Sequence, residues 1–258
     1  MTDEKEIEYH RLLEFAVRAG RVMLSSGAET YRVEDTMNRI LATGNLETAD
    51  TFVMATGVIA TISDPAIRTL TMVRRVQERN TNLNKVTQVN EVSRLFCSGK
   101  MDLEQANRRM DQIEAEVLYS SGMFFLGVIG TTAFFAPIFG GKIEDLVISG
   151  LVGLILAGVL FLCRKNHIHS FLENLISSAV VALMAVLLAK IVPWNLNRDV
   201  IIVSCIMPMV PGVAITNAIR DTFHGDYTSG MARILEAVMT AVAIAVGAGI
   251  GVAVGQLW

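Results

Sequence analysis

The second half of the chain is dominated by long stretches that contain no charged residue. Each stretch is close to the roughly 20 residues that an α-helix needs to cross the hydrocarbon core of a bilayer. The stretches are residues 117–141, 146–163, 174–189, 200–219 and 237–258. The pattern therefore predicts five transmembrane helices embedded in a lipid bilayer.

The first half has a different pattern, in which apolar residues recur at the spacing of amphipathic elements. A period of about 3.6 predicts helices over residues 4–24, 30–41, 85–97 and 103–117. Alternating β-branched residues predict one long or two short strands over 51–62, bent at Gly57, and a further strand over 68–76. Asp102 is the expected N-cap of the last helix. We therefore expect an α-helical polytopic membrane protein, with a small cytoplasmic α+β domain (1–117) before a five-span transmembrane domain (118–258).

Composition supports this division. A soluble domain usually carries about 25% charged residues, whereas this chain of 258 residues carries 18%, with 52% hydrophobic residues. Residues 1–117 hold 15 Lys and Arg and 18 Asp and Glu, while residues 118–258 hold 7 of each class. This distribution excludes a single soluble domain, a disordered chain and a small disulfide scaffold. The net charge of −3, without a basic stripe, argues against nucleic acid as a partner.

Basic residues in the predicted loops indicate the orientation in the membrane, because short loops rich in Lys and Arg stay in the cytoplasm. The second loop carries Arg164 and Lys165, and the fourth carries Arg220 and Arg233. The acidic N-terminus lacks the apolar core of a signal peptide. We expect a multi-pass protein of the cytoplasmic (inner) membrane, with its N-terminus in the cytoplasm and Trp258 outside.

Small residues recur at a spacing of four in two predicted spans and allow close helix packing there. They are Ala243, Gly247, Gly251 and Gly255 in the fifth span, and Ser149, Gly153 and Ala157 in the second. These stripes either pack against other helices of the same chain or form a contact surface for a second subunit. The second subunit is either a different protein or another copy of this chain, which would make a homo-oligomer. Many transporters are built from two repeats, and the chain contains no second copy of its five spans. We therefore expect the missing half on another chain.

A polar motif follows the first predicted helix. Its residues are Ser26, Gly27, Glu29, Thr30, Arg32 and Glu34. Gly27 is expected to end the helix in a left-handed conformation. Ser26 and Glu29 have the spacing of a capping box for the next helix. Arg32 remains available to pair with a carboxylate or to bind an anionic group.

A second polar motif begins inside the fourth predicted span. Its residues are Pro208, Pro211, Gly212, Thr216, Asn217, Arg220, Asp221, Arg233 and Glu236. The prolines and the glycine loosen the helix, and interrupted helices commonly build substrate sites in transporters. We expect a transport path here, in which Arg220 or Arg233 attracts a substrate carboxylate. Asp221, Asp226 or Glu236 would carry a coupling proton.

Together, these two motifs resemble those of the threonine/serine exporter family, over nearly the whole chain. The resemblance rests on Ser26-Gly27-Ala28-Glu29-Thr30, Arg32-Val33-Glu34, Pro211-Gly212, Thr216-Asn217-Ala218, Asp221, Gly225-Asp226, Ser229-Gly230 and Arg233. Full-length members of that family carry a second five-span domain. The resemblance therefore implies the larger half of a split, two-component exporter whose partner is a small membrane protein. Split members include a pair that resembles a succinate exporter.

The leading interpretation is a subunit of a secondary exporter of small metabolites, threonine or serine first, driven by the proton motive force. A dicarboxylate (succinate-type) exporter subunit and a membrane-anchored signalling or scaffold protein are the alternatives. Standard catalytic motifs such as GxSxG and HExxH are absent from the sequence. We therefore expect no enzyme activity, no cofactor and no metal site.

Overall fold

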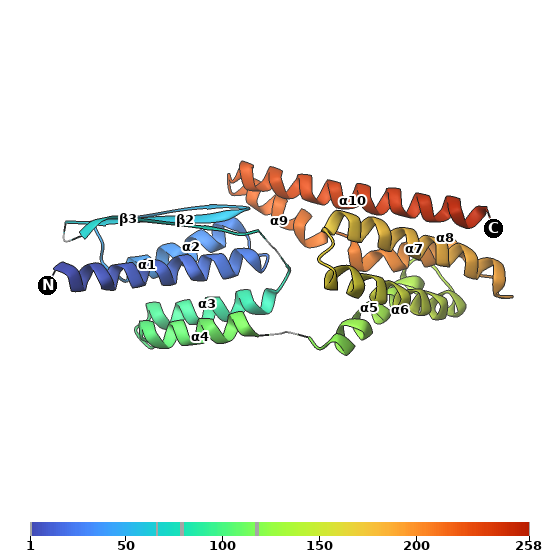
Figure 1. The fold of residues 1–258 in the computed structure, drawn as a ribbon, viewed down its shortest axis with the longest axis horizontal. Helices are drawn as coiled ribbons and strands as arrows, with labels where there is room; N and C mark the ends of the chain where they lie inside the picture. Colours follow the sequence, from blue (N-terminus) through green and yellow to red (C-terminus); the bar gives the residue numbers. More distant parts are fainter. Residues whose placement is uncertain (1, 66, 78–79, 117–118, 258) are drawn as a thin grey trace. The chain divides into compact units, whose positions relative to one another are not determined.

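A computed structural model of the chain describes residues 2–65, 67–77, 80–116 and 119–257. It divides into two compact units (Figure 1). The first comprises residues 1–116 and 212–235, and the second comprises residues 117–211 and 236–258. The predicted domain boundary at residues 117 and 118, and the predicted position of Trp258, lie outside the described residues. The division into domains at that boundary stays a prediction.

The N-terminal part of the first unit contains four helices and a small antiparallel sheet. The helices are α1 (Thr2–Ser25), α2 (Thr30–Ala42), α3 (Leu83–Cys97) and α4 (Leu103–Ala115). The strands are β1 (Thr48–Met54), β2 (Gly57–Asp64) and β3 (Ile67–Arg75), paired in the order β1-β2-β3. The segment predicted to bend at Gly57 forms two strands, with the turn at residues 55–56 and Gly57 as the first residue of β2. Asp102 caps α4 as predicted, within a capping box completed by Gln105.

The core of this unit lies around α1. In Figure 1 the sheet covers one side of α1 and α2, and α3 and α4 lie on the other. The largest fully buried side chains include Phe15 and Met23 of α1, Met37 of α2 and Ile62 of β2. Helical spacing in α1 and strand alternation in β2 place these residues on the faces that meet. The core therefore follows from the periods read in the sequence.

The second unit is helical. It contains α5 (Ser121–Ile138), α6 (Ile143–Lys165), α7 (Ser170–Ile191), α8 (Arg198–Ile206), a 3-10 turn η1 (Met207–Met209) and most of α10 (Tyr227–Gln256). Helix α9 (Gly212–Phe223) belongs to the first unit. Among the described residues, four helices, α5, α6, α7 and α10, are long and apolar enough to cross a membrane. The count reaches five if α8 and α9, which form a pair bent by 55°, are one span.

The bend coincides with the proline-containing break predicted in the fourth span. Helix α8 ends at Ile206, the 3-10 turn contains Pro208, and α9 begins at Gly212 after Pro211. Proline has no amide N–H and its ring clashes with the preceding turn, so a regular helix cannot continue here. The fourth predicted span is therefore two short helices.

Both stripes of small residues pack inside the chain. A Cβ added at Gly251 of α10 would lie 2.2 Å from the carbonyl oxygen of Ala179 on α7. A Cβ added at Gly153 of α6 would lie 2.0 Å from Oγ1 of Thr132 on α5. The prediction that the small residues pack within the chain is thus confirmed. The idea that these faces form a seam to another subunit is wrong, because neighbouring helices already occupy them.

A buried carboxylate that the sequence did not single out ties two loops together in the second unit. Asp145, near the start of α6, is 1% exposed. Its two oxygens accept hydrogen bonds from the amide N–H groups of Lys142, at 2.9 Å, and Asn197, at 2.8 Å. Asp145 therefore holds the segment before α6 against the segment before α8.

Candidate functional site

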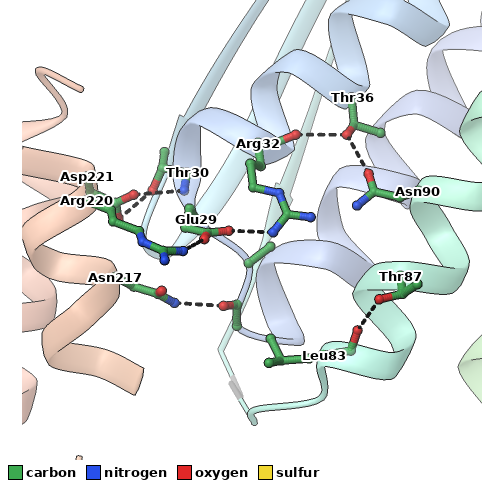
Figure 2. A network of polar contacts seen from close by, with 12 residues as sticks. Glu29, Thr30, Arg32, Thr36, Leu83, Thr87, Asn90, Asn217, Arg220 and Asp221 are labelled. Atoms are coloured by element: carbon green, nitrogen blue, oxygen red, sulfur yellow. Dashed lines mark hydrogen bonds and ion pairs between the residues drawn. The ribbon is translucent and has the colours of Figure 1, made fainter. Parts of the chain in front are cut away.

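The two polar motifs meet in the first unit. The segment between α1 and α2 contacts the polar face of α9 (Figure 2). It also contacts the first turns of α10. Two carboxylates, Glu29 and Asp221, organise the contact, and three arginines surround them. The sequence placed these motifs in two different domains.

Asp221 of α9 stabilises the start of α2. It is fully buried and accepts hydrogen bonds from the amide N–H and the hydroxyl of Thr30, both at 3.0 Å. Thr30 is the first residue of α2, where the helix leaves backbone N–H groups without a partner inside the helix. A negative charge is also favoured at a helix N-terminus. Asp221 thus caps a helix that lies 191 residues away in the sequence.

Arg233 of α10 completes this buried cluster. Its Nε lies 2.9 Å from Oδ2 of Asp221, and the two side chains are 5% and 0% exposed. Its Nη2 donates a hydrogen bond of 2.9 Å to the carbonyl oxygen of Ala28. Removing a charge from such a pair leaves its partner charged, buried and uncompensated, which is strongly destabilising.

Glu29 forms the second cluster, between two arginines. Its Oε2 accepts a hydrogen bond from Nη1 of Arg32 at 3.0 Å, and its Oε1 accepts one from Nη1 of Arg220. Burial by itself raises the pKa of Glu29. A hydrogen bond from its own backbone, together with Arg220 and Arg32, outweighs burial and leaves the pKa lowered. Glu29 therefore stays ionised in the folded protein.

The capping box predicted from Ser26 and Glu29 is wrong. Gly27 takes a φ of +86° and closes α1 as predicted, with the amide N–H of Ala28 bonded to the carbonyl of Met23 at 3.1 Å. Helix α2 then begins only at Thr30, with Glu29 in the N-cap position and no side-chain cap of its own. The carboxylate of Asp221 supplies the missing acceptor.

Three further contacts hold α9 and α10 to the N-terminal elements. The Asn217 side-chain amide donates to the carbonyl of Gly27 at 2.8 Å. The hydroxyl of Ser229 accepts the amide N–H of Ala55 at 3.2 Å. The rings of Tyr31 and His224 stack with centroids 3.9 Å apart. Sequence reasoning did not assign Tyr31 or His224 to the site, and it singled out Ser229 only through the family resemblance.

Thr216 bonds within its own helix, and three other predicted site residues belong to the second unit. The Thr216 hydroxyl bonds back to the carbonyl of Gly212 on its own helix at 2.9 Å. Pro208, Pro211 and Glu236 belong to the second unit. Among the described residues, no three His, Cys, Asp or Glu side chains come together in a group able to hold a metal ion.

Two acidic side chains lie near the stacked rings. Burial raises the pKa of Glu34, and the charge of Asp226 raises it further. Burial also raises the pKa of Asp226, as does the charge of Asp221, while His224 lowers it. Glu34 and Asp226 are therefore easier to protonate than ordinary carboxyl groups.

Comparison with known proteins gives one family and several relatives. The profile of the family described as "Putative threonine/serine exporter" matches residues 14–255. The chain is 22% identical over 228 residues to the "Probable succinate transporter subunit YjjP" of Escherichia coli K12, which covers 88% of each chain. It is 20% identical to the protein of that name from Klebsiella aerogenes, over 92% of this chain and 91% of the relative.

A third relative is longer. The chain is 21% identical over 238 residues to the "Probable threonine/serine exporter" of Mycobacterium tuberculosis. The match covers 90% of this chain but 44% of that protein. No solved structure matches the chain.

Proposed function

Because this multi-pass membrane protein belongs to the threonine/serine exporter family, we propose that it is one subunit of a secondary exporter driven by the proton motive force. The exporter lies in the cytoplasmic membrane, with residues 1–116 and the turn between α9 and α10 on the cytoplasmic side. That orientation agrees with the basic residues near the ends of α6 and α9.

A two-component assembly is supported by the lengths of the relatives. The two relatives named as transporter subunits match this chain over about nine tenths of both lengths. The longer relative extends well beyond the matched region. A separate membrane protein would supply to this chain what the longer relative carries in one polypeptide.

The solute is a small metabolite that carries a carboxylate. Threonine and serine are the first candidates from the family description, and a dicarboxylate is the alternative from the relatives named as succinate transporter subunits. Both classes contain a carboxylate, which arginine binds through charge-assisted hydrogen bonds.

The contact between the two polar motifs is the observation that carries this proposal. Thr30 and Glu29 hold Asp221 and Arg220 of α9, and Arg233 holds the carbonyl of Ala28 from α10. Helix α10 is continuous from Tyr227 to Gln256 and has the length and hydropathy of a span. A rearrangement of the polar clusters therefore acts directly on a membrane helix, as a transport cycle requires.

Efflux from vesicles tests the proposal. Both subunits are reconstituted and the vesicles are loaded with labelled threonine or labelled succinate. We expect one of these solutes to leave faster when the outside is acidic, and a protonophore to abolish the acceleration. Vesicles that contain only this chain are the matched control for the second subunit. If both solutes leave no faster than from loaded vesicles without protein, the proposed exporter function is refuted.

A further inference from the structure

Glu29 is shared by two arginines from distant elements, as Figure 2 shows. Arg32 lies on α2 and Arg220 lies on α9. Two guanidinium groups and one carboxylate leave a local charge of about +1, since arginine stays protonated in proteins. The cluster therefore holds one positive charge that Glu29 does not neutralise.

The exposure of the three side chains differs in an informative way. Glu29 is 6% exposed, whereas Arg32 is 38% exposed and Arg220 is 53% exposed. The carboxylate thus lies beneath two arginines that solvent reaches. Each guanidinium has five N–H donors, and the bonds to Glu29 use Nη1 of each. Both arginines therefore have exposed surface and further N–H donors available for a second carboxylate.

The buried cluster behaves differently. Arg233 and Asp221 are 5% and 0% exposed and neutralise one another. A solute could reach Arg233 only after the cluster had opened. Of the two arginines expected from the sequence to attract a substrate, Arg220 is the accessible one.

We propose that Arg32 and Arg220 form a binding site for the carboxylate of a small metabolite, and that Glu29 is an internal competitor for the same arginines. The inference rests on the proposed function, because it assigns the exported solute to this site. The solute carboxylate adds to the pair or displaces Glu29 from Arg220. The stacked rings of Tyr31 and His224 join the same two segments, because Tyr31 precedes Arg32 in α2 and His224 Nδ1 lies 2.8 Å from the Arg220 carbonyl.

Competition makes a distinctive prediction for Glu29. If Glu29 competes with the solute, Glu29→Gln removes the competing charge, keeps the side-chain length, and tightens binding. If Glu29 only supports the fold, the same change weakens binding or leaves it unchanged. Arg220→Gln and Arg32→Gln should weaken binding by about tenfold or more, the range expected for a lost charge-assisted hydrogen bond.

Equilibrium binding to the purified full-length chain in detergent tests these expectations, with threonine and succinate as separate probes at constant ionic strength. Arg39→Gln is the matched control, because Arg39 is an exposed arginine of α2 that pairs with Asp35. We expect Glu29→Gln to bind about tenfold tighter and Arg39→Gln to bind like the wild type. The probe that binds distinguishes an amino acid from a dicarboxylate. Failure of both probes to bind the wild type, or binding by a folded Glu29→Gln variant that is no tighter than that of the wild type, would overturn the site.

A second measurement uses the unmodified protein and does not depend on how the variants fold. Phenylglyoxal modifies accessible arginines, and mass spectrometry locates the products. The bound probe should protect Arg32 and Arg220 and leave Arg39 unprotected. Equal modification of Arg32 and Arg220 with and without the probe would contradict the proposal. If Arg220→Gln leaves efflux unaffected, the binding site is refuted but the exporter function is not. If the probe binds but no efflux occurs, the exporter function is refuted but the binding site is not.

Discussion

Removing the charge of Asp221 should loosen the start of α2, although the two residues belong to distant parts of the chain. Asp221→Asn keeps the shape of the side chain and leaves Arg233 charged and buried. It also places an amide where one carboxylate oxygen accepts from Thr30. Breaking one partner of a buried ion pair costs about 3–5 kcal/mol.

Hydrogen exchange at the start of α2 measures this loss. Since about 1.4 kcal/mol corresponds to a factor of ten, the amide of Thr30 and its neighbours should exchange between about a hundredfold and a few thousandfold faster in Asp221→Asn. Mass spectrometry of a peptide that covers residues 29–41 reports the change. Peptides from α6 serve as an internal reference in the second unit.

Two variants control for the charge change itself. Asp111→Asn removes an exposed carboxylate that pairs with Arg18, and a surface pair is worth about 0–1 kcal/mol. Exchange at α2 should then rise by no more than about fivefold. The double variant Asp221→Asn with Arg233→Gln removes the uncompensated charge and should recover part of the protection. Exchange within threefold of wild type in Asp221→Asn would refute the view that Asp221 caps α2.

Three further predictions concern stability. Gly251→Leu should lower the thermal unfolding midpoint of the chain without its partner, because the new side chain meets the backbone of Ala179. Gly249→Leu is the control and should not lower the midpoint, since nothing lies within 4 Å of a Cβ there. Equal midpoints for the two variants would contradict the packing of α7 against α10. Burial, and then the charge of Asp221, raise the pKa of Asp226. The folded state therefore binds the proton more tightly than the unfolded state, and the stability falls as the pH rises from the ordinary pKa of a carboxyl group through the raised pKa of the folded state. Asp226→Asn lacks that loss and should be more stable than wild type at neutral pH, with the difference disappearing in acid; a constant difference across a pH series of unfolding midpoints would oppose this. Asp145→Ala removes two hydrogen bonds from backbone N–H groups to a charged acceptor and should cost about 1.5–3 kcal/mol, the range for a hydrogen bond to a charged group, measured by denaturant unfolding; a loss under about 0.5 kcal/mol would show that water replaces the carboxylate.

The helices and strands could be predicted from the sequence because their causes are local. A long stretch without charge forms a membrane helix, since a helix satisfies its own backbone groups in lipid. The alternation along 51–62 places Val58 and Ile62 on the buried face of β2. Pro208 and Pro211 break the fourth span through the missing N–H and the ring of proline alone.

The same local rules account for what could be foreseen of the site. Gly27 was recognised because a left-handed residue after a helix favours glycine. The polar residues of the proline-broken span stood out because polar groups are costly in or beside a membrane. The residue types were thus predictable, but their partners were not.

Only the tertiary structure decided which charges pair. Asp221 meets Thr30 across 191 positions, and Arg220 meets Glu29 across the same separation. A carboxylate is equally suited to any nearby cation or helix N-terminus, so its sequence neighbours do not specify its partner. For the same reason Ser26 looked like the cap of α2, whereas the folded chain brings Asp221 to that position. Close packing decided the role of Gly251 as well, because a small residue permits contact with any helix and the fold selected α7.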